Sequence, residues 1–522
     1  MAERVESTTA MTMRRLLSVF PIGFVVVFLV LPFFNSVASF FSLSTTREVL
    51  SNSSMLGIVW FSLWQAMLSV VATMIVAFPA TWALSRFQFR GAQLCRGLLT
   101  TPFVLPSIVV AAGVLAITHR TGVVSILWAH VVFNVAVVLR LVGPRWSLLH
   151  PKYEESAATL GSSPLRTFVY VVWPTIRTTV RSAAALVFAY CFTSFGVISI
   201  VGGFSRRTLE TEIFTQSVRL GNMDVAISLA IIQMIVVLLV FQISRPSVQQ
   251  TSSINVVATP TALNVKTRGR WIVLVSVVAP TLIVTLPLLA TLMRSISYRG
   301  QLSLHAWSTV LSGTLPRLNV STWKVMGTSL VFSLATAFLA VSLALIASQQ
   351  MSGNHFQYSS QHRVLRLITS LPIVVSAATL GLGLVTTFNK DPFAWRSHTW
   401  LIPVIHAVIA LPIAIRILEP AIQAIPLTLR DNAATLGATP WQTWLHVDVA
   451  LLRPALLRSF GFAATISLGE FGATSFLTRS DSTTMTMAIS QLLGRPGAIT
   501  QQSGYVLASV LIVLTVGISS RA

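Results

Sequence analysis

Long apolar runs alternate with short polar segments along nearly all of the 522 residues. Three of the clearest runs are LLSVFPIGFVVVFLVLPFF (16–34), SAAALVFAYCFTSFGVISIVGG (182–203) and WIVLVSVVAPTLIVTLPLLATL (271–292). Each is close to the roughly 20 apolar residues that an α-helix needs to cross a bilayer. The pattern therefore predicts an all-α fold and a polytopic membrane protein.

The polar breaks divide the chain into twelve predicted membrane helices. Their ranges are 16–38, 57–84, 97–117, 123–139, 182–202, 225–243, 271–292, 325–348, 367–386, 400–415, 459–476 and 504–520. The stretch 244–270 is polar, rich in Ser and Thr, and has no spanning run, so it predicts a linker. We expect a first half (1–243) and a second half (271–522) with six helices each.

A polar phrase occurs twice, as EESAATLGSSPLRTF (154–168) and DNAATLGATPWQTW (431–444). The shared AATLG recurs after 276 residues, and a shift of 270 aligns 102–115 with 372–385. Further identities at the first shift are His130 with His406, Arg140 with Arg416, Pro144 with Pro420, Arg177 with Arg453, and Phe195-Gly196 with Phe471-Gly472. They indicate an internal duplication. Because each half has an even number of spans, the halves are expected to be parallel repeats with a pathway between them.

The repeated phrase predicts a helix, a turn and a second helix. In the first repeat loop, about 143–178, the acids Glu154 and Glu155 lie near a helix start, where the helix dipole favours them. Gly161 stands where a left-handed residue ends a helix, and Ser163 with Pro164 predicts the start of the next. The second repeat loop, about 419–455, repeats this with Asp431, Gly437, Thr439 and Pro440. Partnerless interfacial helices are the alternative, but duplication favours a docking role.

Composition supports the membrane class and weakens a nucleic-acid interpretation. Charged residues are 10% and hydrophobic residues 54% of the chain, whereas soluble domains carry roughly 25% charge. The net charge of +22 is explained by basic residues that gather in cytoplasmic loops. With the N-terminus inside, most of the 36 Lys and Arg fall on that side, so both termini are expected to be cytoplasmic. The first apolar run is longer than a signal-peptide core and is kept as a membrane helix.

The sequence has no motif for a hydrolytic or metal site. It contains no Gly-Lys dipeptide, hence no GxxxxGK[ST] phosphate loop, and no HExxH, GxSxG or CxxC. Cys95 and Cys191 have no partner spacing. His130 and His406 are candidate proton relays, but their occurrence in both halves favours a packing role with both ring nitrogens satisfied. We expect a protein that is not an enzyme and draws energy from a separate ATPase or a gradient.

Glu470 lies inside the apolar run ATISLGEFGATSFL. An ionisable group at that depth costs at least ~2.5 kcal/mol on insertion scales, so it should face the bundle interior or a wet cavity. It is a candidate for the translocation path of a cationic substrate, with a buried structural acid as the equal alternative. Its counterpart is Ser194, and the following Phe195 and Phe471 are candidates to line a gate or simply to fill the core.

The repeated phrase resembles the coupling-loop motif of bacterial ABC-importer permeases, Glu-Ala-Ala, three residues, Gly. The matching residues are Glu155, Ser156, Ala157, Ala158 and Gly161 in the first copy, and Asp431, Asn432, Ala433, Ala434 and Gly437 in the second. The resemblance implies that each loop docks in a groove of a cytoplasmic ATPase, where Glu155 and Asp431 meet basic groups. Ser156, Asn432 and Ala450 depart from the pattern and would weaken or re-tune one docking.

The whole chain resembles two fused permease halves of the thiamine, ferric iron and molybdate branch. The phrases 193–218 and 468–493 carry this similarity, and the first is closest to thiamine permeases. The resemblance implies a bacterial inner-membrane permease that receives a solute from an extracytoplasmic binding protein and works with two copies of an ATPase. ATP and Mg would be used by that partner, and this chain would bind no cofactor. Ferric iron, then an oxyanion, are the alternative substrates, and a gradient-driven secondary transporter is the alternative class.

Overall fold

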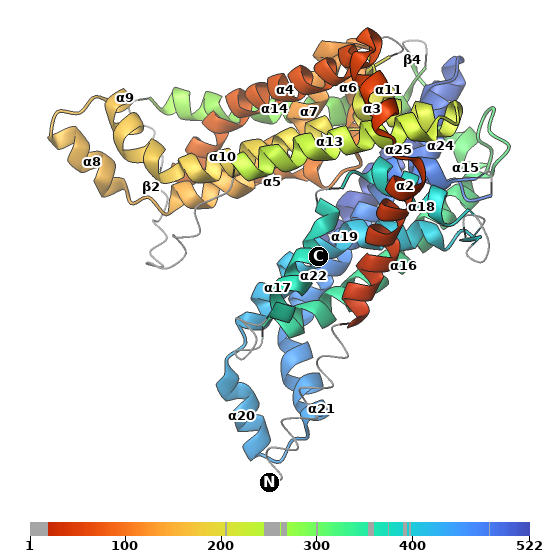
Figure 1. Cartoon of the computed structure of the whole chain (residues 1–522). Coiled ribbons are helices and arrows are strands. Elements are labelled where there is room, and N and C mark those ends of the chain that lie inside the picture. The colour runs from red at the N-terminus through yellow and green to blue at the C-terminus, as the bar shows by residue number, and fades with distance from the viewer. Residues whose placement is uncertain are drawn as a thin grey trace.

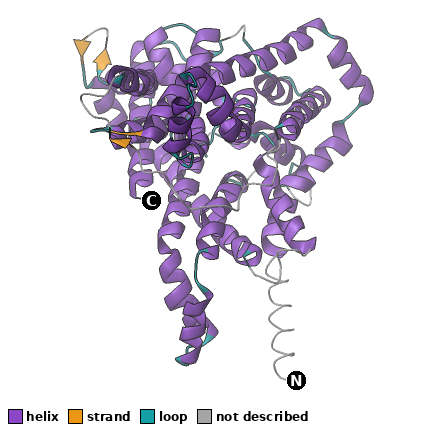
Figure 2. Ribbon diagram, turned by 90° about the vertical axis from the view of Figure 1, so that its left-hand side faces the viewer, coloured by secondary structure: helices purple, strands orange, loops and turns teal. Residues whose placement is uncertain are grey.

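The computed structural model describes residues 19–203, 206–244, 261–262, 269–298, 301–352, 360–373, 375–389, 394–395, 398–479 and 481–521. Most of these residues are helical, which confirms the predicted all-α class (Figure 2). The strands are two-residue pairs, β1 (Phe87–Gln88) with β2 (Thr261–Ala262) and β3 (Ser297–Tyr298) with β4 (Gln301–Leu302). The first residues of the first predicted span and most of the predicted linker lie outside the described residues.

The first half is built from a helix Val19–Phe40, which includes α2 (Leu31–Phe40), and from the elements that follow it. These are α3 (Leu43–Ser51), α4 (Ser53–Arg86), α5 (Ala92–Thr100), α6 (Ser107–Thr118), α7 (Val123–Ser147), α8 (Pro151–Thr159), α9 (Pro164–Thr167), η3 (Phe168–Val172), α10 (Trp173–Phe192), α11 (Gly196–Val201), α12 (Leu209–Phe214) and α13 (Met223–Ile243).

The second half begins with α14 (Arg270–Ser295). It continues with α15 (His305–Leu311), α16 (Thr322–Met351), α17 (Ser360–Ser370), α18 (Ala377–Thr387), α19 (Leu401–Gln423), α20 (Leu427–Thr435), α21 (Pro440–Thr443), η7 (Trp444–Asp448), α22 (Val449–Gly469), α23 (Gly472–Leu477), α24 (Met485–Leu493) and α25 (Ala498–Arg521).

Nine helices of the described chain are long and apolar enough to cross a membrane. Eight of them match predicted spans, whereas Pro440–Gly469 shares only residues 459–469 with the predicted span 459–476. A tenth candidate is the pair α5–α6, which is bent by 106° across its break. The remaining predicted spans, 182–202 and 367–386, are interrupted between α10 and α11 and between α17 and α18. Pro106 lies at the break between α5 and α6, where it supplies no backbone N–H to continue the helix. Hydropathy alone does not reveal such breaks.

The duplicated sequence builds the same three-helix core twice. In the first half α4, α7 and α10 pack against one another, and in the second half their repeat counterparts α16, α19 and α22 do the same. These cores are rich in small side chains; Ala337, Ala340, Ala407, Ala410 and Ala463 form one cluster. In a membrane the hydrophobic effect does not drive helices together, so they associate through close van der Waals packing. Small residues permit this close approach.

The first helix of each half crosses to the other half. Helix α14 packs on α4, α5 and α6, and α2 packs on α18. Figure 1 shows this exchange, with green α14 among the first-half helices and red α2 against the cyan second-half helices. Because α6 and α18 are themselves repeat counterparts, the two crossings are equivalent contacts.

Each crossing depends on a glycine that the repeat places at the same position. A Cβ added to Gly113 in α6 would lie 2.2 Å from the carbonyl oxygen of Pro287 in α14. A Cβ on its counterpart Gly383 in α18 would lie 3.3 Å from Pro32 in α2. The Leu-Pro pairs of the two crossing helices therefore pack directly against bare backbone. The repeated glycines explain how closely the halves approach.

From this junction the halves extend as two diverging arms. Figure 1 shows α8 and α9 at the end of one arm and α20 and α21 at the end of the other, far apart. The two repeat loops thus lie at the arm ends, while the crossing helices and the inter-half contacts lie where the arms meet.

Replacing Gly113 by Ala should lower the stability of the folded chain by about 1–3 kcal/mol, because the new methyl group clashes with backbone that cannot rotate away. Thermal unfolding of the purified protein in detergent, followed by size-exclusion fluorescence, measures this. Gly97→Ala is the matched control, since a Cβ there meets nothing within 4 Å. Equal unfolding temperatures for the two variants would show that the close contact is unimportant.

Candidate functional site

Both repeat loops end their first helix in the same hydrogen-bonded motif. In the first loop the N–H of Ser162 bonds to the carbonyl of Ala157 at 2.9 Å, and that of Gly161 to Ala158 at 3.0 Å. The second loop repeats both bonds, Ala438 to Ala433 at 3.0 Å and Gly437 to Ala434 at 3.0 Å. The two glycines have φ values of 76° and 82°, the left-handed region that favours glycine. This confirms the predicted helix end.

The second helix of each loop also starts as predicted. Ser163 accepts a hydrogen bond from the N–H of Arg166, and Thr439 accepts one from the N–H of Gln442, with a proline at the next position in both. Each short helix continues through a π-helical turn, η3 and η7, into a long core helix. The turns are counterparts in the repeat, so each loop is joined by a continuous helix to α10 or α22.

The loop surfaces carry large exposed apolar side chains that the sequence analysis did not single out. Leu160 and Leu436, at equivalent positions before the two glycines, are 87% and 88% exposed. Tyr153 and Trp441 are also exposed. The predicted acidic residues Glu155 and Asp431 are exposed as well. Each loop therefore presents an exposed leucine next to an exposed acid, and the arrangement is the same in both copies.

The two loops are tied down by ion pairs of opposite arrangement. Glu154 in α8 pairs with Arg86 at the end of α4, which also donates to the carbonyl of Leu149. The repeat counterpart of Glu154 is Arg430, which donates from Nε to Asp448 in η7 at 2.8 Å. The first loop is thus fixed to α4, a core helix to which it is not directly connected. The second loop is fixed to η7, the turn that follows it in the chain. Glu154 is held by the protein itself, whereas its neighbour Glu155 is free to meet a partner.

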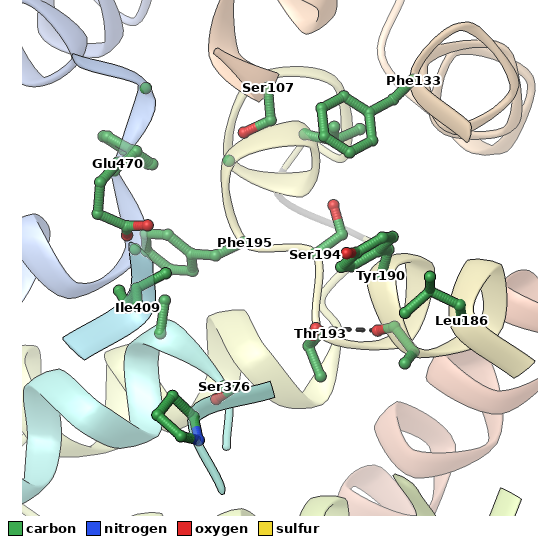
Figure 3. A pocket seen from close by; sticks show the side chains of 18 of the residues that line it. Ser107, Phe133, Leu186, Tyr190, Thr193, Ser194, Phe195, Ser376, Ile409 and Glu470 are labelled. Atoms are coloured by element: carbon green, nitrogen blue, oxygen red, sulfur yellow. Dashed lines mark hydrogen bonds between the residues drawn. The ribbon is translucent and has the colours of Figure 1, made fainter. Parts of the chain in front are cut away.

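A cavity of about 300 Å³ lies between the two halves, near the lower end of pockets that hold small ligands. All four predicted path residues line it: Ser194, Phe195, Glu470 and Phe471. Figure 3 shows Ser194, Tyr190 and Phe133 on the first-half side, and Glu470 and Ile409 from the second half. The structure brings these residues to one place, and their transport role stays a prediction.

The repeated Phe-Gly pairs bring the two walls together. The rings of Phe195 and Phe471 stack across the halves, with centroids 5.3 Å apart and planes 25° apart. The following glycines pack closely within their own halves, because a Cβ on Gly196 would lie 2.4 Å from Ser107 Oγ and one on Gly472 would lie 3.0 Å from Ala377 Cβ. Both stacked rings line the cavity.

Glu470 is held by the protein and also faces the cavity. It lies at the break between α22 and α23, and its Oε1 accepts a hydrogen bond from the N–H of Ala473 at 2.9 Å. The carboxylate therefore caps the short helix α23, where the helix dipole favours a negative group. It also lines the cavity. The predicted span 459–476 is thus broken at this residue.

A second buried acid, Glu210 in α12, was missed from the sequence. Its side chain is fully buried and accepts hydrogen bonds from Gln233 Nε2 and, at 3.3 Å, from the N–H of Ala378 in α18. It therefore joins the first half to the second. The signal was present in the phrase TLETEIF, but a short acidic helix outside the predicted spans gave no reason to expect burial.

The two repeat histidines differ in their surroundings. His406 bonds through Nδ1 to Ser467 Oγ and through Nε2 to Thr474 Oγ1, both at 2.8 Å. His130 bonds through Nδ1 to Ser69 Oγ at 2.9 Å, but its Nε2 has no hydrogen-bond partner within the described part of the chain. The position equivalent to Thr474, which is the partner of His406 Nε2, is Ile198 in the first half, and its side chain cannot form a hydrogen bond. The expectation of satisfied ring nitrogens therefore fits His406 and is only half met at His130.

Comparison with known proteins identifies a shared domain and full-length relatives. Residues 340–522 match the family described as binding-protein-dependent transport system inner membrane component. The chain is 26% identical to the thiamine transport system permease protein ThiP of Escherichia coli (strain K12), over 88% of this chain and 86% of that protein. It is 25% identical to ThiP of Haemophilus influenzae, over 94% and 93%.

A third relative matches only part of the chain. The putative 2-aminoethylphosphonate transport system permease protein PhnV of Salmonella typhi is 28% identical, over 44% of this chain but 85% of that protein. Nearly a whole relative thus corresponds to less than half of this chain, as expected for a duplicated protein.

Arg86→Glu should loosen the first repeat loop, because it leaves Glu154 beside a like charge. We expect local stability to fall by about 1–3 kcal/mol, between the values for exposed and buried pairs because Glu154 is one-third exposed. Hydrogen exchange of the amides of 152–162 should be at least roughly tenfold faster. The swapped double variant Arg86→Glu/Glu154→Arg should recover part of the protection, because the charge pair returns but the carbonyl of Leu149 still loses its donor. Arg90→Glu, an exposed cation nearby, should leave protection unchanged. Exchange in the swapped variant as fast as in Arg86→Glu would show that charge pairing does not hold the loop.

Proposed function

The chain carries a binding-protein-dependent transport inner-membrane domain and is homologous over most of its length to fused two-half ABC permeases, and from this premise we propose that it is the permease of an ATP-driven thiamine importer. The single observation that carries the substrate is the match to thiamine permeases along both halves. The chain would receive thiamine from an extracytoplasmic binding protein and release it into a bacterial cytoplasm. Both termini and both repeat loops would face that cytoplasm.

Two copies of a separate ATPase would dock on the two repeat loops. The exposed leucines Leu160 and Leu436 would enter an apolar groove of the ATPase, and Glu155 and Asp431 would meet basic groups at its rim. This arrangement has an apolar centre and a charged edge, the usual anatomy of a protein interface. ATP and Mg would be bound and used by the ATPase, and the permease would bind no cofactor.

The geometry supports an alternating-access cycle. The two repeat loops are far apart in Figure 1, as expected for a permease open towards its ATPases. When the ATPases close on ATP, they would draw the loops together, and the continuous helices through η3 and η7 would carry this motion to α10 and α22. Those helices end beside Ser194 and Glu470 in the cavity wall. The stacked Phe195 and Phe471 would then separate and admit solute from the binding protein.

The double variant Glu155→Arg/Asp431→Arg tests docking at both loops. Because each change places a cation against basic groups, affinity for the ATPase should fall at least about tenfold. ATPase stimulation by thiamine-loaded binding protein in proteoliposomes should be lost with it. Glu48→Arg makes the same charge change on an exposed residue of α3, at the opposite end of α4 from the first loop, and should bind the ATPase with the parent affinity.

Two results would contradict different parts of this proposal. Normal coupling by the double variant would exclude the repeat loops as the docking sites. Coupling that responds only to a binding protein loaded with ferric iron or an oxyanion would keep the permease assignment and exclude thiamine.

A further inference from the structure

One wall of the inter-half cavity is aromatic. Phe103, Phe133 and Tyr190 form a cluster, with ring centroids 5.6 Å apart for the two phenylalanines and 6.3 Å for each phenylalanine with the tyrosine. They come from three separate elements of the first half, the turn after α5, α7 and α10. Phe133 and Tyr190 line the cavity directly.

The second half has no aromatic residue at the equivalent positions. In the repeat alignment the residues equivalent to Phe103, Phe133 and Tyr190 are Ile373, Ile409 and Ile466. Ile409 lines the same cavity, and Figure 3 shows it across from Phe133 and Tyr190. Packing between two similar halves would be served by isoleucine on both sides. The aromatic triad on one side only therefore points to a role other than packing.

The aromatic wall already holds a planar cation. The guanidinium of Arg140 lies 5.3 Å from the ring centroid of Phe103 and 5.9 Å from that of Phe462 in the second half. Such a contact is attractive because the faces of aromatic rings are electron-rich. Phe103 and Phe462 lie behind the cavity surface, but Phe133 and Tyr190, which line it, offer the same kind of ring face to a flat positive group.

The same wall has polar atoms without partners. His130 Nε2 and Asn134 Oδ1 have no hydrogen-bond partner among the described residues, although their side chains are only 2% and 1% exposed. Both residues line the cavity beside Phe133. Buried polar atoms are normally paired, so these two atoms are acceptors in one cavity wall that a bound donor could satisfy. In the second half the counterpart of Asn134 is Ala410, and His406 is fully paired.

We propose that the wall formed by Phe133, Tyr190, His130 and Asn134 is a one-sided substrate site that stacks a flat, cationic heteroaromatic ring. This inference rests on the proposed function and deepens it, because thiamine carries a cationic thiazolium ring and an aminopyrimidine. The rings of Phe133 and Tyr190 attract the cation by their faces. His130 Nε2 and Asn134 Oδ1 match the amino group of the pyrimidine.

The charged residues that line the cavity are of both signs, so they do not by themselves select a cationic ring. Glu470, across the cavity, lies in the opposite wall and favours a positive substrate. Arg416 also lines the cavity and is exposed, so the charge of the cavity is mixed. Recognition therefore depends on the ring faces and the unpaired polar atoms rather than on a net negative charge.

The test uses a cysteine reporter in the cavity. Ser194→Cys is introduced in a chain with Cys95→Ser, reconstituted with its ATPase, and its rate of maleimide labelling is measured against thiamine concentration. Thiamine should slow labelling. Converting the wall to the residues of the second half, Phe133→Ile/Tyr190→Ile, should raise the half-protecting thiamine concentration about tenfold. Tyr190→Phe retains the ring and should stay close to the parent.

Controls separate binding from folding. The labelling rate without thiamine should be the same in all variants, which shows that the cavity is intact. Ile466→Val changes the residue equivalent to Tyr190 in the other half and should not alter protection. Molybdate, an anion without a ring, should give none.

Specific outcomes overturn the inference. Unchanged protection in the double isoleucine variant, or equal protection by molybdate, would exclude the aromatic wall as the site. So would the absence of protection in a parent complex that does take up thiamine, and there the proposed function would survive. A parent complex that neither takes up thiamine nor is protected by it would overturn the proposed function and this inference together.

Discussion

The contact between the crossing helices and the bare backbone of Gly113 and Gly383 is the constraint on which the structure depends. It packs the first helix of each half against the opposite half. Because the two contacts are equivalent in the repeat, they form a symmetric junction. The diverging arms, the repeat loops at their ends and the cavity near their base all take their positions from it.

Within this symmetric frame the functional surfaces are unequal. The junction, the three-helix cores and the loop turns are the same in both halves, but the cavity walls are not. One wall has Tyr190 and Phe133, and the other has isoleucines and Glu470. This difference suits a permease whose solute is asymmetric. The similar cores of the two halves would move together, while only one cavity wall would contact the solute.

The ion pairs of the loops show the same principle. Glu154 ties the first loop to α4, whereas its counterpart Arg430 ties the second loop to η7. The same closing movement of the ATPases would therefore reach the two cores through different contacts. The departures of Ser156 and Asn432 from the family pattern affect exposed positions and leave the backbone of both turns unchanged.

Much of this could be predicted from the sequence, because its signals are local. Apolar length predicts helices, and Gly161 and Gly437 predict the loop turns through their need for a left-handed backbone. The broken helices, the crossing of α2 and α14 and the burial of Glu210 depend on contacts between residues far apart in the chain. Repetition drew attention to Phe195 and Phe471, which the structure places in the lining of one cavity, but it could not show that His130 lacks the partner that His406 has.

The central claim, that the two loops transmit ATPase closure to the cavity, is tested most directly by a distance. Spin labels at the exposed, equivalent positions Thr159 and Thr435 report the loop separation in the reconstituted complex by double electron–electron resonance. The account predicts a clear shortening of this distance when ATP binds, with the long distance restored after hydrolysis. An unchanged distance in a complex that binds ATP and transports solute would contradict it.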